Sequence, residues 1–369
     1  MRELTRDDIS NILYGCAILG TGGGGTLDEG FALIDEALAK GKRFRLAGFE
    51  EMPEDAVIGT PYGCGAISPL TEEEIAKYAR LSLPEENMYV LCMEQMEKFL
   101  GRPVDAVVST ELGGMNTATA FYCGAMADRL IMDADPAGRS VPALQHSTYF
   151  IEGVPMCPMS VMNKFGEGAV FTRVFDDERG EDMVRALAVV SQNMIAVMDH
   201  VNTAKVLKDA LILGAISYAE KIGKAFLEAK ASGTDYVSAV TKAGEGKTMF
   251  TGTIKSNDWE TRDGYTFGDT VVEGSGEFDG KTLRIWYQNE NIISWLDGEY
   301  YVTVPDLICV FNEDERMPQL NPYGKAGTKV SVAALPAPDA WTSTRGLEVF
   351  GPRSFGYDLD YVPFCKQNV

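Results

Sequence analysis

The chain has 369 residues, which is long enough for two domains of ordinary size. Apolar residues make up 45% and charged residues 24%, a composition typical of a globular protein with a large core, so disorder is excluded as the main state. The 33 Lys and Arg against 54 Asp and Glu give a net charge of −21, which repels phosphate backbones and anionic lipids. Nucleic acid and membrane surfaces are therefore poor partners.

The first residues and the cysteines predict the cellular compartment. Acidic side chains occupy the N-terminal segment where a secretory signal would have a basic region. The longest uncharged stretch, residues 9–27, is too rich in Gly, Ser, Asn and Thr for a transmembrane helix. The seven cysteines are odd in number and lack a Cys-x-x-Cys pair, which favours free thiols in a reducing compartment. We therefore expect a cytoplasmic protein with no transmembrane helix.

Residues 1–170 alternate short apolar runs with helical patterns, which predicts an N-terminal domain of α/β layers. The expected strands cover residues 43–48, 56–61, 104–110 and 129–135. The expected helices cover residues 6–19, 28–40, 71–81, 85–100 and 116–127, and the third has a Thr71-x-x-Glu74 capping box.

Residues 171–369 are expected to form a second domain that begins with two long helices and continues as β structure. Residues 181–229 are predicted to form two long helices, because apolar residues fall at three- and four-residue spacing from Met183 to Val201 in the first and from Leu207 to Ala219 in the second. From about Thr248 onward, alternating patterns and glycines at turn positions predict strands. The predicted fold class is therefore α/β, with a layered N-terminal domain and a β-rich C-terminal domain.

A glycine loop, Gly20-Thr-Gly-Gly-Gly-Gly25, precedes the second predicted helix. The backbone N–H groups of Gly22, Gly23, Gly24 and Gly25 can approach an anion or a carbonyl oxygen because no Cβ intervenes. The dinucleotide-binding fingerprint fails, since a helix and not a strand comes before the glycines, and the Lys-Ser/Thr of a P-loop is missing. The alternative is a tight turn between two packed helices.

Two predicted strands end in carboxylates, at the edge of the sheet where ligands bind in α/β proteins. Glu111 and Asn116, with Gly113 and Gly114 between them, follow one strand, and the alternative for both polar residues is a helix cap.

Asp133 and Asp135 end the other strand. Their two-residue spacing puts both on one face of a strand, where repulsion can raise one pKa or both can hold a cation. Arg139 can clamp a substrate carboxylate or pair with Asp135.

Further candidates lie outside these strand ends. Cys64 stands between two glycines, as a nucleophile or, alternatively, as a buried small hydrophobe. His146 can carry a proton at neutral pH, whereas His200 lies inside a helical pattern and is expected to be structural. Asn289 and Asn291 share a face and offer amides to a polar heterocycle, unless they belong to a hairpin turn.

Six segments, taken in order, resemble the S-methyl thiohydantoin desulfurase-like family, long listed only as a domain of unknown function. They are Gly20-Thr-Gly-Gly-Gly-Gly25, Glu111-Leu-Gly-Gly-Met-Asn116, Asp133-Ala-Asp-Pro-Ala-Gly-Arg139, Asn289-Glu-Asn291, Pro305-Asp-Leu-Ile308 and Gly351-Pro-Arg-Ser-Phe-Gly-Tyr357. The resemblance spans nearly the whole chain and implies an α/β half and a β-rich half. Two segments depart from the family pattern: Pro142-Ala-Leu-Gln145 lacks the usual glutamate, and Gly63-Cys64-Gly65 replaces the more common Gly-Ala-Pro.

The resemblance implies a hydrolase of small cyclic amides that releases methanethiol from an S-methyl thiohydantoin and leaves a hydantoin. Glu111, Asp133 or Asp135 would activate water and His146 would act as an acid, while covalent attack by Cys64 is the competing route. Backbone N–H groups of Gly22, Gly23, Gly24, Gly25, Gly113 and Gly114 would hold the ring carbonyl or the adduct. Asn116 and Asn289 would orient the ring, and Arg139 would bind a carboxylate side arm.

The resemblance and the residues also allow other functions. The family's genes are often associated with hydantoinase or oxoprolinase subunits, so the alternative is a non-catalytic or ATP-linked subunit that partners such a protein. A divalent metal, Zn²⁺ or Mn²⁺, is an option through Asp133, Asp135, Glu111 and His146. We expect a symmetric homo-oligomer from the general frequency of such assemblies.

Overall fold

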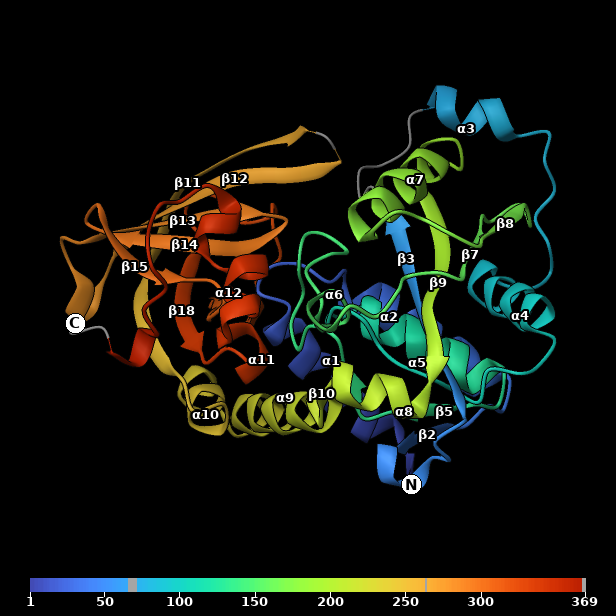
Figure 1. Cartoon of the computed structure of the whole chain (residues 1–369). Coiled ribbons are helices and arrows are strands. Elements are labelled where there is room, and N and C mark those ends of the chain that lie inside the picture. Colours follow the sequence, from blue (N-terminus) through green and yellow to red (C-terminus); the bar gives the residue numbers. More distant parts are fainter. Residues whose placement is uncertain (66–71, 263, 367–369) are drawn as a thin grey trace.

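Two eight-stranded β-sheets, one from each half of the chain, form the framework of the protein (Figure 1). The computed structural model describes residues 1–65, 72–262 and 264–366, so the expected capping box, which depends on Thr71, lies outside the described residues. The arrangement confirms the predicted α/β fold class with a β-rich second half.

The first sheet is mixed, with the strand order β1-β2-β5-β4-β3-β9-β7-β8. Strands β2, β5, β4 and β3 run parallel, and the other neighbours pair antiparallel. The strands are β1 Arg2–Leu4, β2 Phe44–Ala47, β3 Val57–Gly65, β4 Ala106–Val107, β5 Leu130–Met132, β7 Met159–Met162, β8 Gly168–Phe171 and β9 Met194–Thr203. The helices of this half are α1 Arg6–Leu19, α2 Leu27–Ala39, α3 Glu72–Tyr78, α4 Met88–Leu100, α5 Asn116–Met126, α6 Thr148–Glu152 and α7 Asp177–Val189.

Residues 194–203 form a strand and not the expected helix. Helix α7 ends at Val189, and β9 then pairs with both β3 and β7 inside the first sheet. Residues 195–200 are all buried, so no polar face marks the two-residue period of a strand. An apolar run of this kind cannot be told from a buried helix by periodicity alone. The predicted helix from Met183 to Val201 is therefore wrong beyond Val189.

The second sheet is antiparallel throughout, with the order β15-β14-β13-β12-β11-β18-β16-β17. Two helices, α9 Ala215–Ser232 and α10 Tyr236–Ala243, precede it. Its strands are β11 Lys247–Arg262, β12 Tyr265–Gly274, β13 Thr282–Gln288, β14 Glu290–Leu296, β15 Glu299–Thr303, β16 Leu307–Asn312, β17 Met317–Pro318 and β18 Lys329–Leu335. The remaining elements are short: β6 Ala134–Asp135 pairs with β10 Ile212–Leu213, and α8 Ala204–Leu207, α11 Asp339–Thr342 and α12 Thr344–Phe350 lie in the connections.

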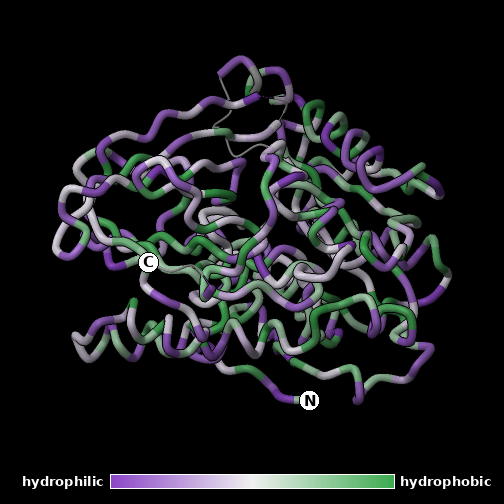
Figure 2. Tube along the Cα trace, turned by 60° about the vertical axis from the view of Figure 1, so that its left-hand side comes forward, coloured by the Kyte–Doolittle hydropathy of each residue, from purple (hydrophilic) through white to green (hydrophobic). Residues whose placement is uncertain are grey.

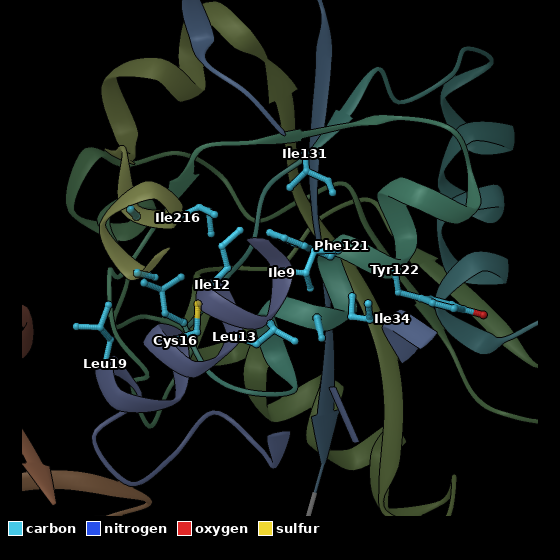
Figure 3. Close-up of a cluster of buried hydrophobic side chains, with 14 of the residues drawn as sticks. Ile9, Ile12, Leu13, Cys16, Leu19, Ile34, Phe121, Tyr122, Ile131 and Ile216 are labelled. Atoms are coloured by element: carbon cyan, nitrogen blue, oxygen red, sulfur yellow. The ribbon is translucent and has the colours of Figure 1, made fainter. Parts of the chain in front are cut away.

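One hydrophobic core joins the two halves. Helix α1 starts with a capping box between Thr5 and Asp8, and its buried side chains repeat at three- and four-residue spacing. Figure 3 shows these side chains beside Ile34, Phe121 and Ile216, which come from α2, α5 and α9. The same cluster includes Leu307 of the second sheet, so the halves share apolar contacts.

The hydropathy of the chain follows this core. The trace is mostly hydrophobic inside the molecule and hydrophilic along the outer loops (Figure 2). Within the described part of the chain, no helix is both long enough and apolar enough to span a bilayer.

Candidate active site

A narrow pocket lies between β3, β9, α6 and the loop that follows β4. Its lining combines hydroxyl, carboxyl and imidazole groups with a few apolar side chains, from Thr60, Tyr62, Thr110, Glu111, Val141, Ala143, Leu144, His146, Ser147, Tyr149, Asp199 and His200. The empty volume is about 290 Å³, but the space is constricted and has room for about one water molecule. A five-membered ring therefore enters only if the lining moves outward.

Glu111 lines this pocket with a carboxyl group whose environment favours the neutral form. Burial raises its pKa well above the usual value, and the negative charges of Glu290 and Glu181 raise it further. Its backbone φ is +57°, a conformation that costs a non-glycine residue about 1–3 kcal/mol and is concentrated at functional sites. Asn116 Nδ2 donates a hydrogen bond to Glu111 Oε2 at 3.2 Å, so its amide orients the carboxyl group. A fixed, protonated carboxyl group is suited to donating a proton.

The glycine loop, residues 20–25, packs against the segment that carries Glu111. The carbonyl oxygen of Gly24 accepts hydrogen bonds from the N–H groups of Met115 and Asn116. A Cβ on Gly24 would lie 2.5 Å from the Cα of Gly113, so the two segments touch because neither has a side chain there. The pocket lining includes none of Gly22, Gly23, Gly24, Gly25, Gly113 and Gly114, so their role as donors to a substrate stays a prediction.

The structure separates Asp133 from Asp135. Asp133 accepts hydrogen bonds from the N–H and hydroxyl groups of Ser217, near the start of α9, at 2.9 and 2.5 Å. Asp135 accepts the N–H groups of Ala137 and Gly138, both at 2.7 Å, and burial raises its pKa to about 7. The strand is interrupted between β5 and β6, and the two carboxyl groups bind different partners. The structure therefore does not bring them together, and their role as an acid and base pair stays a prediction.

Arg139 is fully buried and connects the two halves. Its Nη2 donates to Thr21 Oγ1 at 2.8 Å, and its Nη1 donates to the carbonyl oxygen of Pro305 at 3.0 Å. These acceptors belong to the protein, and Arg139 is not part of the pocket lining. The geometry therefore favours neither of the expected roles, a clamp for a substrate carboxylate or a partner for Asp135.

His146 lines the pocket but does not titrate near neutral pH. Burial, with the positive charge of Arg139, lowers its pKa to about 3, so the ring stays neutral and is not the proton carrier that the sequence predicted. Its ring packs against Phe350 and Phe355, with centroids 5.1 and 5.5 Å away.

Cys64 lies in β3 outside the pocket lining, and burial raises its pKa to about 12. The alternative expectation, a buried small hydrophobe, fits this environment better than a nucleophile does.

Asn289 and Asn291 support the backbone around β14. Asn289 has a φ of +58°, and its Oδ1 accepts the N–H of Thr266 at 2.9 Å, which is the turn role expected as the alternative. Asn291 Nδ2 donates to the carbonyl oxygen of Ile308 at 2.9 Å. Glu290, between them, is buried and accepts a hydrogen bond from Ser140 Oγ at 3.0 Å. These amides therefore hold protein atoms.

The sequence patterns do not reveal the carboxyl and imidazole groups that β9 brings to the pocket. Asp199 and His200 line it from within β9, which continues to Thr203, and φ of His200 is +45°. Glu181 of α7 binds Arg185 at 2.6 Å and accepts the N–H of Leu144, a lining residue, at 3.0 Å. The adjacent Asp199 and His200 after an apolar run resemble the other strand ends, but the helical interpretation hides that signal.

The expected metal ligands are not gathered. Among residues 1–65, 72–262 and 264–366, no group of three or more His, Cys, Asp and Glu side chains is placed to hold a metal ion. Asp133 binds Ser217 and Asp135 binds backbone N–H groups, so neither joins Glu111 and His146 at the pocket.

Two sheets joined by one core, with a narrow carboxyl-bearing pocket in the first half, define a two-domain α/β protein. The chain belongs to the S-methyl thiohydantoin desulfurase-like family. The family models described as "S-Me-THD-like, N-terminal domain" and "S-Me-THD-like, C-terminal domain" match residues 7–173 and 175–364. The strand β9 nevertheless adds residues 194–203 to the first sheet, and the expected boundary at residue 170 stays a prediction.

A crystal structure of a protein from Chromobacterium violaceum has the same fold. The two chains superpose with a TM-score of 0.76 and are 24% identical, and the match covers 98% of this chain and 100% of the other. No curated protein matches the sequence.

Proposed function

We propose that the protein is a hydrolase of small cyclic amides that converts an S-methyl thiohydantoin and water into a hydantoin and methanethiol. The name of the family to which the chain belongs points to this substrate. The observation that carries the proposal is the place of Glu111 in the pocket lining, where its surroundings raise the pKa of its carboxyl group well above the usual value. A thiolate leaves carbon more readily when it receives a proton, and such a carboxyl group can supply one at neutral pH.

Glu111 acts as acid and base in turn. Its proton first goes to the imine nitrogen of the substrate, which makes the carbon that bears sulfur more electrophilic. The Glu111 carboxylate then takes a proton from water as the water oxygen bonds to that carbon, which gives a neutral tetrahedral adduct. Finally the C–S bond breaks, Glu111 gives its proton to sulfur, and it takes the proton of the adduct hydroxyl. Hydantoin and methanethiol are released with the carboxyl group restored.

Asn116 is the positioning residue of this scheme. Its amide N–H donates to Glu111 Oε2, which favours the carboxyl proton on the other oxygen, Oε1. The proton therefore has one defined place from which it is transferred. A fixed donor lowers the barrier because no rotation of the carboxyl group has to precede the reaction.

The covalent route through Cys64 has less support. Its thiol is protonated at neutral pH because burial raises the pKa to about 12, and no His or Lys is hydrogen-bonded to it among the described residues. A thiol nucleophile normally has a lowered pKa.

The experiment is a turnover assay on the whole chain with an S-methyl thiohydantoin, in which a thiol reagent detects methanethiol and mass spectrometry detects the hydantoin. We expect the wild-type protein to form both products in equal amounts and Glu111→Gln to lower kcat/KM by about a thousandfold. Cys64→Ser should stay within about tenfold of the wild type. Full activity of Glu111→Gln would contradict the proposal, and turnover only after addition of a hydantoinase-like protein would favour the subunit alternative.

A further inference from the structure

A chain of buried polar groups at the wall of the pocket has no part in the reaction scheme above. Tyr62 in β3 donates its hydroxyl proton to Asp199 Oδ2 at 2.7 Å. Asp199 Oδ1 lies 2.9 Å from His200 Nδ1, and His200 Nε2 lies 3.5 Å from Asp177 Oδ2 in α7. The chain thus runs from the pocket to α7, through residues that are each at most 5% exposed.

His200 fixes the direction of its hydrogen bond to Asp199, and its Nε2 forms an ion pair with Asp177. Burial lowers its pKa, but the carboxylates of Asp199 and Asp177 outweigh burial and raise the pKa to about 9. The ring is therefore an imidazolium at neutral pH, and both of its nitrogens are donors. The ring of Tyr149 stacks on it, with centroids 4.3 Å apart and an interplanar angle of 18°.

Both carboxyl oxygens of Asp199 have partners in this chain. One of its oxygens faces an imidazolium donor, and the other takes the proton of Tyr62. Burial and the charge of Asp199 raise the pKa of Tyr62 well above the usual value, so its hydroxyl group stays protonated. A hydroxyl group has a single proton, and here that proton is committed to Asp199. The oxygen of Tyr62 therefore has only lone pairs left for a molecule in the pocket.

We infer that Tyr62 is a specificity-determining residue that accepts a hydrogen bond from a ring N–H of a cyclic amide, held in that role by Asp199, His200 and Asp177. The inference rests on the proposed function for the class of substrate. It selects rings that keep a free N–H beside the carbonyl group and rejects rings alkylated at that nitrogen. A site built to hydrogen-bond an N–H discriminates strongly, because the analogue leaves a buried polar group unpaired.

The test is calorimetric binding of hydantoin, 1-methylhydantoin and 3-methylhydantoin to the whole chain. The wild-type protein should bind hydantoin about 10- to 100-fold more tightly than one of the two methylated rings. Tyr62→Phe should remove that preference because it weakens the binding of hydantoin alone. The matched control is Tyr301→Phe, since Tyr301 is a buried tyrosine of the second sheet whose hydroxyl donates to the carbonyl oxygen of Met249 at 2.8 Å.

Asp199→Asn is the second variant and reverses the hydrogen bond. The new amide oxygen can face His200 while its N–H₂ group donates to Tyr62, which frees the Tyr62 proton for the pocket. The preference for a free ring N–H should then fall at least as far as in Tyr62→Phe, although the tyrosine is intact. Circular dichroism and thermal melting establish that each variant is folded.

Each result decides the inference. The role of Tyr62 would be overturned if the wild-type protein had no preference for a free ring N–H. It would also be overturned if Tyr62→Phe kept this preference or weakened the binding of all three rings equally. Failure of all three rings to bind would overturn it as well. N–H-selective binding without release of methanethiol from an S-methyl thiohydantoin would sustain it and refute only the proposed reaction.

Discussion

At the scale of single residues, the raised pKa of Glu111 lowers the stability of the fold at high pH and provides a proton for the reaction. Desolvation and neighbouring negative charges raise the pKa of its carboxyl group well above the usual value, so the group keeps its proton to a higher pH than a free glutamate does. In the unfolded chain the same group has a pKa near 4.5. Below that pH, Glu111 is protonated in the folded and in the unfolded protein. Between the unfolded pKa and the folded pKa, it is protonated only in the folded protein. Stability is therefore lost as the pH rises from the unfolded pKa towards the folded pKa.

Glu111→Gln should consequently stabilise the protein at pH 8 and lower its activity. The amide is neutral at every pH, so the variant escapes the cost of keeping a buried carboxyl group protonated. Thermal unfolding from pH 4 to pH 8 measures this: the melting temperatures of the variant and the wild type should coincide near pH 4 and separate in favour of the variant as the pH rises. A constant difference at all pH values would show that Glu111 titrates normally.

The activity has a matching pH dependence. The reaction begins from the protonated carboxyl group, so kcat/KM should be level at neutral pH and fall as the pH passes through the raised pKa of Glu111. A profile that instead rises with pH above 4.5 would mean that Glu111 starts as a base.

The sequence predicts which polar residues lie close to strand ends, but it does not predict which partner each of their side chains binds. Glu111 reaches the pocket as expected, whereas Asp133 binds Ser217 and Arg139 binds backbone carbonyl groups of the other half. These partners lie 84 and 166 positions away in the chain, and no local pattern marks such contacts. Asp199 and His200 are missed because their strand looks like a helix.

At the scale of elements, the contact between residues 20–25 and the Glu111 segment requires glycine on both sides. Gly24 has a φ of +80°, and a Cβ there would meet the backbone of Gly113 at 2.5 Å. Gly41 has a similar φ of +70° but nothing within 4 Å of an added Cβ. Alanine substitutions at Gly24 and Gly41 therefore separate the cost of backbone strain, which both have, from the cost of the close contact, which only Gly24 has.

Gly24→Ala should cost about 3 kcal/mol or more, because backbone strain and a backbone clash add, whereas Gly41→Ala should cost about 1 kcal/mol. Urea unfolding gives both free energies. Gly24→Ala should also lower turnover, since Gly24 supports the N–H groups of Met115 and Asn116 and hence the amide that orients Glu111. Equal losses of stability for the two variants would show that the loop is not packed as described.

Most elements follow from local sequence patterns. The helix over residues 6–19 has its predicted bounds, since a capping box and an apolar face agree there. The prediction fails for β9 because both faces of this strand are buried, and that burial arises only when the sheet is assembled. The homo-oligomer and the hydantoinase-like partner stay predictions, because they depend on surfaces outside a single chain.

At the scale of the whole molecule, Arg139 links the halves beside their shared core. It is completely buried, and its guanidinium donates to Thr21, Pro305 and Asp306. Loss of the guanidinium leaves several buried carbonyl groups without donors and removes the positive charge near Glu290. The two halves should then separate more easily.

Arg139→Met should lower the free energy of unfolding by about 3–5 kcal/mol and increase cleavage between the halves in limited proteolysis. The control is Arg179→Met, which removes an exposed partner of Asp182 and should cost less than about 0.5 kcal/mol. A small loss for Arg139→Met, without added cleavage, would mean that the core alone holds the halves together.

The most direct measurement is a crystal structure of the protein with hydantoin bound. We expect the ring to lie in the pocket at Glu111, with a ring atom about 3 Å from its carboxyl group and with the lining moved outward. A larger apolar pocket, with an empty volume of about 810 Å³, lies beside Leu112, Tyr218 and Pro338. Hydantoin bound there, and away from Glu111, would contradict the account.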